Sequence, residues 1–303
     1  MAHTTYPPST RRKAILGFTL ATLAAIGFST KAILVKLAYH YPVDAVTLLA
    51  LRMLFSAPFF LLIGLRHAHS KQQTPLSRKD YLALLVLGLS GYYLSSLFDF
   101  IGLQYISAGL ERLILFLYPT LVVILSAAFL RKPFGRKELL ALLLSYSGIG
   151  VVVFDQLHIQ AEHLWLGAGF VFASTLTYAF YLIGTGEFVV KIGASRFTAY
   201  AMLVACTATV LQFVCTHPLQ ALDLPMQVYQ YCAVMAIFST VLPVFMLSAA
   251  IRMIGSSHTS MIGSLGPVST LLLATLFLGE TLTELQIGGA VLVMLGVLSL
   301  TLR

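Results

Sequence analysis

Ten apolar stretches, each long enough to form a helix that crosses a lipid bilayer, follow one another along almost the whole chain. A crossing helix needs about 20 apolar residues, and barrel strands would instead be short and alternate between apolar and polar positions. The pattern therefore predicts an all-α membrane protein with ten transmembrane helices. The predicted helices cover residues 14–39, 44–65, 81–103, 108–130, 138–154, 164–186, 197–215, 228–251, 257–278 and 285–302.

The composition agrees with a location in lipid. Of the 303 residues, 58% are hydrophobic and only 10% are charged, which leaves too little polar surface to cover a water-soluble globule of this size. The short polar segment before the first helix has no Ala-x-Ala-like site, so we expect no cleaved signal peptide.

Positive charge is distributed unevenly between the two sides of the predicted bundle. The net charge of +8 would suggest nucleic acid binding in a soluble chain. Here all Lys and Arg residues except Lys31, Lys36, Arg52 and Arg112 lie at the termini or in connections on one side, and the opposite connections carry none. Because positive residues gather on the cytoplasmic side, both termini are predicted to be cytoplasmic, and no nucleic acid partner is expected.

The second half of the chain repeats the first. A shift of 148 positions places residues 101–154 on 249–302 without a gap and matches Pro119 with Pro267 in the middle of two helices. The two repeats are predicted to cover residues 14–154 and 164–302. Since each has five crossings, the second enters the membrane from the opposite side. Inverted repeats are a basis of alternating access in transporters; duplication that only builds a stable bundle is the alternative.

The segments 102–130 and 274–298 resemble the two copies of the EamA-type domain of the drug/metabolite transporter superfamily. The residues that carry the resemblance are Tyr105-Ile106-Ser107-Ala108, the mid-helix Pro119 and Pro267, and Leu278-Gly279-Glu280 with Gly288, Gly289 and Gly296 after it. The resemblance implies a carrier of small metabolites with ten helices in two repeats, commonly an exporter of amino acids or related compounds from bacteria.

Two places depart from the family pattern. The first repeat has Leu130-Arg131-Lys132 where the family would have Leu-Gly-Glu, and the cytoplasmic position of this loop explains its positive charge. At Glu111 and Arg112 the family usually has small or apolar residues, which suggests a subgroup with its own substrate.

Five ionisable residues of the predicted helices are expected to lie in the hydrocarbon: Lys31, Arg52, Asp99, Glu111 and Arg112. Such groups are costly in hydrocarbon and normally face a cavity or a partner. The short connection 104–107 brings Asp99 level with Glu111 and Arg112, which predicts an Asp99–Arg112 pair, and a contact between Glu111 and Lys31 also fits. These pairs either lock the first repeat together or contact the substrate directly.

Arg52 is the strongest candidate for substrate binding. Its own stretch, 48–60, contains no acidic residue, and Arg stays protonated even when it is buried. A cation of this kind suits a carboxylate or a phosphate. The five charges sum to +1, so we expect a cavity that favours a carboxylate-bearing solute, including a zwitterionic one.

Aromatic side chains and prolines complete the predicted site. Tyr93, Tyr118 and Tyr178 are predicted to line the substrate path and to orient the solute through their hydroxyls, with simple packing as the alternative. Tyr118 precedes Pro119, whose missing N–H frees a carbonyl one turn earlier. Pro267 should act in the same way, so both prolines are predicted to be helix kinks or hinges.

No motif suggests an enzyme. G-x-S-x-G and H-E-x-x-H are absent, and the three cysteines lack C-x-x-C spacing, so neither a metal site nor a cofactor is predicted. We predict a secondary carrier of a small molecule in the bacterial inner membrane, with the lipid bilayer as its environment. A channel or a membrane scaffold subunit without carrier activity is the alternative. Coupling to Na⁺, coupling to H⁺, exchange and facilitated diffusion all fit the sequence, and it does not determine the oligomeric state.

Overall fold

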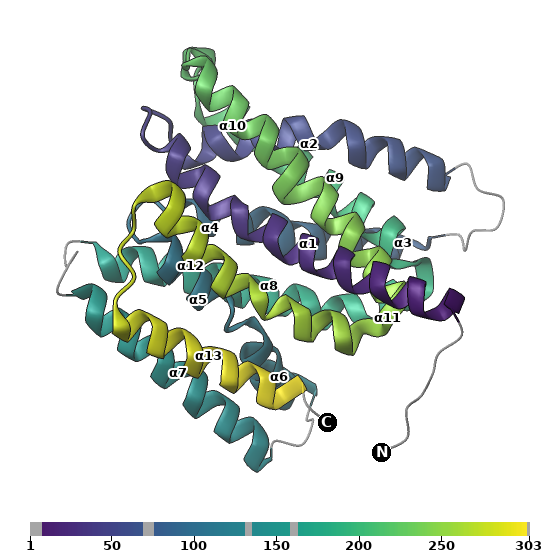
Figure 1. The fold of residues 1–303 in the computed structure, drawn as a ribbon. Coiled ribbons are helices and arrows are strands. Elements are labelled where there is room, and N and C mark those ends of the chain that lie inside the picture. The colour runs from purple at the N-terminus through teal and green to yellow at the C-terminus, as the bar shows by residue number, and fades with distance from the viewer. Residues whose placement is uncertain (1–7, 69–75, 131–134, 158–162, 302–303) are drawn as a thin grey trace.

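The computed structural model describes residues 8–68, 76–130, 135–157 and 163–301, which form a bundle of helices (Figure 1). No strand occurs among these residues, which confirms the all-α prediction; Arg131 and Lys132 lie outside them. The helices are α1 Pro8–Ala38, α2 Ala45–Ala68, α3 Arg78–Gly88, η1 Leu89–Leu94, α4 Ser95–Gly102, α5 Ala108–Leu115, α6 Tyr118–Leu130, α7 Arg136–Leu157, α8 Leu164–Ile192, α9 Ala194–Thr216, η2 Leu219–Leu222, α10 Met226–Ala236, η3 Ile237–Val241, α11 Leu242–Gly263, α12 Leu265–Leu278 and α13 Glu284–Thr301.

Eight helical segments in the described ranges are long and apolar enough to cross a membrane. They are Arg12–Ala38, Ala45–Arg66, Arg78–Gly102, Ala108–Phe129, Glu138–Asp155, Leu164–Thr185, Ala194–Thr216 and Met226–Gly255. Two further apolar helices, at Leu265–Leu278 and Glu284–Ser299, are shorter. The protein therefore crosses the membrane several times, as the hydrophobic pattern predicts.

Several of these segments are interrupted where the sequence contains proline or glycine. α5 ends at Leu115 and α6 begins at Tyr118, so Pro119 lies in the first turn of a new helix, where its missing N–H leaves no intrahelical bond unmade. Pro267 lies in the same way in the first turn of α12. The sequence suggested kinks in continuous helices, whereas the structure breaks both helices before the proline. Gly255, with φ of 81°, adds a sharp change of direction inside α11.

Two other segments contain a short π-helix instead of a break. η1 joins α3 to α4 and η3 joins α10 to α11, and both have the hydrogen-bond pattern of a π-helix. π-turns inside α-helices are rare and frequently mark functional sites. Each lies in the middle of a segment long enough to cross the membrane.

Polar contacts join distant connections at one end of the bundle. Glu280, in the connection after α12, accepts hydrogen bonds from the backbone N–H groups of Ala108 and Gly109 at 2.9 and 3.3 Å. These groups begin α5 and have no partner within their own helix. Nearby, Lys36 Nζ donates to the carbonyl of Leu103 at 3.1 Å. We call this the Glu280 end; it lies on the left in Figure 1.

The opposite end of the bundle carries an ion pair. Lys191 Nζ lies 2.6 Å from Asp80 Oδ2, which joins the last turn of α8 to the first turn of α3. Asp80 also forms a capping box with Ser77, so the start of α3 is fixed from two sides. We call this the Lys191 end.

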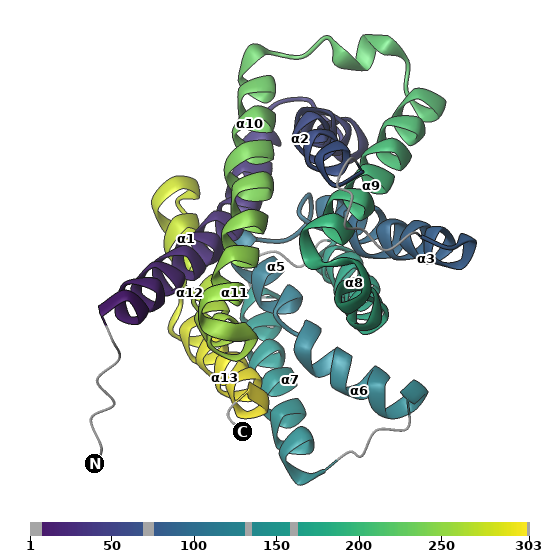
Figure 2. The same cartoon turned by 90° about the vertical axis from the view of Figure 1, so that its right-hand side faces the viewer.

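The helices of the two halves of the chain are interleaved. α1 packs on α11 and α12, α2 on α9 and α10, α4 on α8, and α7 on α13. Figures 1 and 2 show α7 and α13 side by side. They approach closely because Gly148 and Gly289 face each other: a Cβ added to either would lie 2.6 Å from the carbonyl oxygen of the other.

Candidate substrate site

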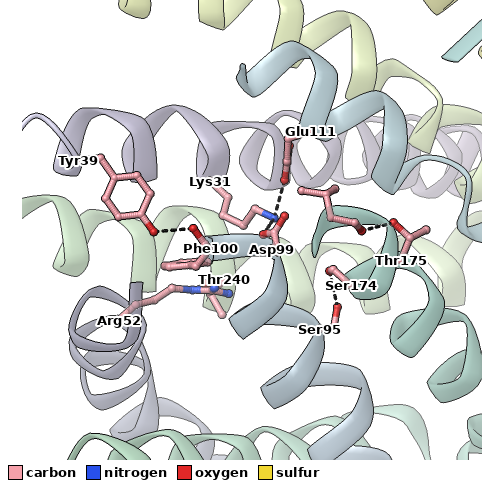
Figure 3. Close-up of polar contacts among 11 residues, drawn as sticks. Lys31, Tyr39, Arg52, Ser95, Asp99, Phe100, Glu111, Ser174, Thr175 and Thr240 are labelled. Carbon is pink, nitrogen blue, oxygen red and sulfur yellow. Dashed lines mark hydrogen bonds and ion pairs between the residues drawn. The ribbon is translucent and has the colours of Figure 1, made fainter. Parts of the chain in front are cut away.

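Three ionisable side chains from three helices meet inside the bundle. Lys31 of α1 places its Nζ 2.5 Å from Asp99 Oδ2 of α4 and 3.0 Å from Glu111 Oε1 of α5. The side chains of Asp99 and Glu111 are 3% and 0% exposed, and that of Lys31 is 16% exposed. Figure 3 shows the ammonium between the two carboxylates. We call these three residues the buried triad.

The triad corrects the predicted Asp99–Arg112 pair, because Asp99 contacts Lys31 instead. Glu111 and Arg112 are adjacent on α5, and adjacent helical residues point in different directions. Glu111 faces α1, whereas the guanidinium of Arg112 lies against α12, where a Cβ added to Gly266 would be 2.5 Å from Arg112 Nη2. The alternative contact between Lys31 and Glu111 is present.

Arg52 reaches the same region from α2. Its Nε donates to Thr240 Oγ1 in η3 at 3.1 Å, and its Cζ lies 5.3 Å from the centroid of the Phe100 ring. The residue is only 7% exposed. It interacts electrostatically with Asp99 and Lys31, yet its direct contacts are a hydroxyl and an aromatic ring (Figure 3). The sequence gives no hint of Thr240, which lies 188 positions from Arg52.

Two of the three predicted tyrosines meet in an aromatic group. The rings of Tyr118 and Tyr178 are 5.5 Å apart in an edge-on arrangement, and Tyr178 stacks on Tyr181 at 5.6 Å. The hydroxyl of Tyr181 donates to that of Tyr92 at 3.0 Å. Tyr93 packs elsewhere, against the apolar core that α1, α2 and α10 share.

The aromatic group and the triad are linked through Arg112. This side chain interacts electrostatically with Tyr118, Tyr178 and Glu111. The region therefore combines positive charge, paired carboxylates and phenol hydroxyls. Within the described ranges, no group of three or more His, Cys, Asp or Glu side chains is placed to hold a metal ion.

Five buried polar atoms of this region have no hydrogen-bond partner among the described residues. They are two donors, Arg52 Nη1 and Arg112 Nε, and three acceptors, Asp99 Oδ1 and both carboxylate oxygens of Glu111, of which Oε1 is ion-paired with Lys31. A buried polar atom without a partner costs about 1–3 kcal/mol, and native structures contain few of them. Such a set of donors and acceptors suits a polar ligand that carries charges of both signs.

Comparisons with known proteins agree with the membrane assignment. The EamA-like transporter family matches residues 15–154 and, a second time, residues 165–302. The uncharacterized transporter YcbK of Bacillus subtilis (strain 168) is 30% identical over 285 residues, which cover 92% of this chain and 90% of YcbK. The uncharacterized transporter YyaM of the same organism is 29% identical over 225 residues, 73% of each chain. A crystal structure of a protein with 17% identity has the same fold, with a TM-score of 0.65 over 96% of this chain and 97% of the other.

Proposed function

The chain belongs to the EamA-like transporter family, and from this premise we propose that it is a secondary carrier of a small zwitterionic solute, such as an amino acid, with export favoured. The family and the similar transporters identify a membrane transporter rather than an enzyme. The proposed location is the bacterial inner membrane. Both termini and the Lys191 end face the cytoplasm in this proposal, because the basic residues of the connections gather on that side.

The proposed carrier has ten crossings in two inverted repeats, residues 14–154 and 164–302. Two matches to one family support this arrangement. The structural interruptions support it too, since η1 begins 148 positions before η3, and the ends of α5 and α11 have the same offset. α12, together with the stretch after the change of direction in α11, provides the ninth crossing, and α13 provides the tenth.

The observation that carries the substrate class is the set of five buried donors and acceptors that have no hydrogen-bond partner among the described residues. The free Nη1 of Arg52 can donate to a carboxylate of the solute, a strong charge-assisted contact. Asp99 Oδ1 and Glu111 Oε2 can accept from its ammonium. An α-amino acid supplies both groups and thereby offsets the cost of all three buried atoms. Tyr118 and Tyr178 form the adjacent wall of the path.

Alternating access requires helices that bend while the site stays closed to one side. The breaks before Pro119 and Pro267 and the π-turns of η1 and η3 provide such points, because intrahelical hydrogen bonds are already interrupted there. Thr240 lies in η3 and holds Arg52, so a movement of η3 would move the proposed carboxylate site. Tyr93 lies in η1 and is proposed to face the path when that helix moves.

The first test is export of amino acids from bacterial cells. The wild type, Arg52→Gln and an empty vector are compared by mass spectrometry of the medium, and membrane insertion is verified for each variant. Arg66→Gln is the matched control, because Arg66 is an exposed arginine on the same helix. We expect export by the wild type and Arg66→Gln, and a loss of at least tenfold in Arg52→Gln, which corresponds to one charge-assisted contact of about 1.5 kcal/mol or more.

The outcomes separate the competing functions. The purified protein is reconstituted into liposomes, and the liposomes are loaded with a mixture of the 20 common L-amino acids. Exchange of the internal amino acids with labelled external amino acids is then measured. Saturable exchange supports a carrier, whereas flux that rises linearly with concentration indicates a channel. No flux in cells or liposomes would favour a scaffold subunit. Unchanged export by Arg52→Gln would contradict the proposed carboxylate site.

A further inference from the structure

The buried triad has two carboxylates and only one ammonium in direct contact with them. Lys31 Nζ donates a hydrogen bond to Asp99 Oδ2. Its contact with Glu111 is an ion pair, and neither carboxylate oxygen of Glu111 accepts a hydrogen bond. Glu111 is also the more deeply buried of the two acids. A buried carboxylate is unfavourable unless it is paired and hydrogen-bonded. Glu111 is therefore the less well compensated acid.

The surrounding charges do not take the place of a second cation. Arg52 approaches from α2 but donates to Thr240, and Arg112 directs its guanidinium to α12. The other titratable groups that interact with this region are neutral tyrosine hydroxyls: that of Tyr39, just after α1, interacts with Asp99, and those of Tyr118 in α6 and Tyr178 in α8 interact with Arg112. α12 itself contributes no titratable side chain. In the direct contacts of the triad, two carboxylates therefore face a single ammonium, that of Lys31.

The two carboxylates also lie near enough to share a proton. Asp99 and Glu111 repel each other electrostatically and are within reach of a mutual hydrogen bond. With both acids ionised, no hydrogen atom lies between them, and Asp99 Oδ1 and Glu111 Oε2 stay without partners. A proton on Glu111 would provide the O–H that Asp99 can accept. Two acids in this arrangement favour a state in which one of them is protonated.

We propose that Glu111 carries a proton in the solute-free carrier and releases this proton when the ammonium of the solute binds to the carboxylates of Glu111 and Asp99. This inference rests on the proposed function and adds its coupling ion. On the outer side, water gives a proton to Glu111 and an O–H bond forms. On the cytoplasmic side, the solute binds, the O–H bond breaks and the proton leaves to water. One proton enters for each solute that leaves, so the carrier is a proton–solute antiporter.

The test uses purified full-length protein in liposomes that contain the pH indicator pyranine. The probe is the mixture of the 20 common L-amino acids, and N-acetylated amino acids, which keep the carboxylate but lack the ammonium, serve as a second probe. For the wild type, an amino acid gradient should drive proton movement in the opposite direction, and the N-acetylated probe should drive at least tenfold less. Exchange of labelled amino acids is measured in the same preparation.

The decisive variant is Glu111→Gln, whose amide resembles the protonated acid and can still donate to Asp99. We expect it to lose proton movement, by at least tenfold, while it retains amino acid exchange with a KM raised about tenfold. Glu284→Gln is the matched control, because Glu284 is exposed in the first turn of α13; it should move protons like the wild type. Proton movement at the wild-type rate in Glu111→Gln would overturn the inference.

Two further outcomes separate this inference from the proposed function. Wild-type exchange without proton movement would overturn proton coupling and leave the carrier function intact. Absence of any exchange in the wild type would overturn both. If Glu111→Gln does not fold, Glu111→Asp keeps a carboxylate at a changed distance from Lys31. A shift of at least half a pH unit in its exchange profile supports the role of this acid, and a profile that superimposes on the wild type overturns it.

Discussion

Substitution of Gly289 by Ala should force α7 and α13 apart. A Cβ at this position would lie 2.6 Å from the carbonyl oxygen of Gly148, whereas a Cβ at the neighbouring Gly288 would have no atom within 4 Å. Gly288→Ala therefore adds the same methyl group to the same helix without a contact. The two variants form a matched pair in which only the approach of the helices differs.

The expected difference follows from the contact distance. Carbon–oxygen contacts between close backbones are normally about 3.3–3.6 Å, so the helices must separate by roughly 0.7–1 Å. A gap of that size forfeits about a quarter to a half of each van der Waals contact, and overpacking typically costs about 1–3 kcal/mol. Ala is favoured over Gly in a helix by about 1 kcal/mol in both variants. Gly288→Ala should gain about 1 kcal/mol and Gly289→Ala should lose about 0–2 kcal/mol.

The assay is thermal unfolding in detergent, followed with a maleimide dye that fluoresces when it reacts with thiols. Cys206 and Cys232 are buried and become reactive on unfolding. Cys215 is exposed, so it is replaced by Ser in every protein to remove the background. The midpoint of Gly289→Ala should lie several degrees below that of Gly288→Ala at the same heating rate. Equal midpoints, or the opposite order, would refute the close contact between α7 and α13.

Two further predictions concern the Glu280 end. Glu280→Ala should lower the free energy of unfolding by about 1–2 kcal/mol, because two N–H groups at the start of α5 lose their acceptor; Glu284→Ala, measured in the same thermal assay, should change it by less than half as much. Asp44→Ala should cost about 1 kcal/mol through loss of the cap of α2, and Asp44→Asn should retain most of it. Partial burial opposes ionisation of Asp44, but hydrogen bonds from Thr47 outweigh it and hold the pKa below its usual value. The ionised carboxylate therefore stabilises the fold above about pH 4. The difference in free energy of unfolding between the wild type and Asp44→Asn should disappear as the pH falls through that lowered pKa. A difference that does not depend on pH would contradict the role of the ionised carboxylate as the cap.

The sequence predicts an all-helical membrane protein because the requirement for a crossing is local. A run of apolar residues must be about as long as the hydrocarbon is thick, whatever its neighbours are. The partners of the charged residues depend instead on how each helix is rotated about its axis. Asp99 and Arg112 lie at similar depths, yet the rotation of α5 turns Arg112 toward Gly266 and presents Glu111 to Lys31. Depth can be counted from the sequence, whereas rotation is decided by packing.

The contacts of Arg52 and the helix breaks illustrate the same limit. The stretch around Arg52 contains no acidic residue, and the partner of Arg52, Thr240, comes from the other half of the chain. Neither η1 nor η3 contains a proline. Proline gives a stronger signal, since Pro119 and Pro267 both lie within three residues of a helix start.

The interleaved packing of the two halves has a consequence for synthesis. The ribosome delivers α1 to α7 first, and the faces of α1, α2 and α7 that later contact α11, α9 and α13 are bordered by lipid until those helices are inserted. The buried triad can assemble in this period, because Lys31, Asp99 and Glu111 all come from the early helices. Thr240 reaches Arg52 later, and Glu280 reaches the start of α5 later still. The charged centre is thus available before the walls that enclose it, and a chain that ends before α12 inserts most of its helices without completing the site.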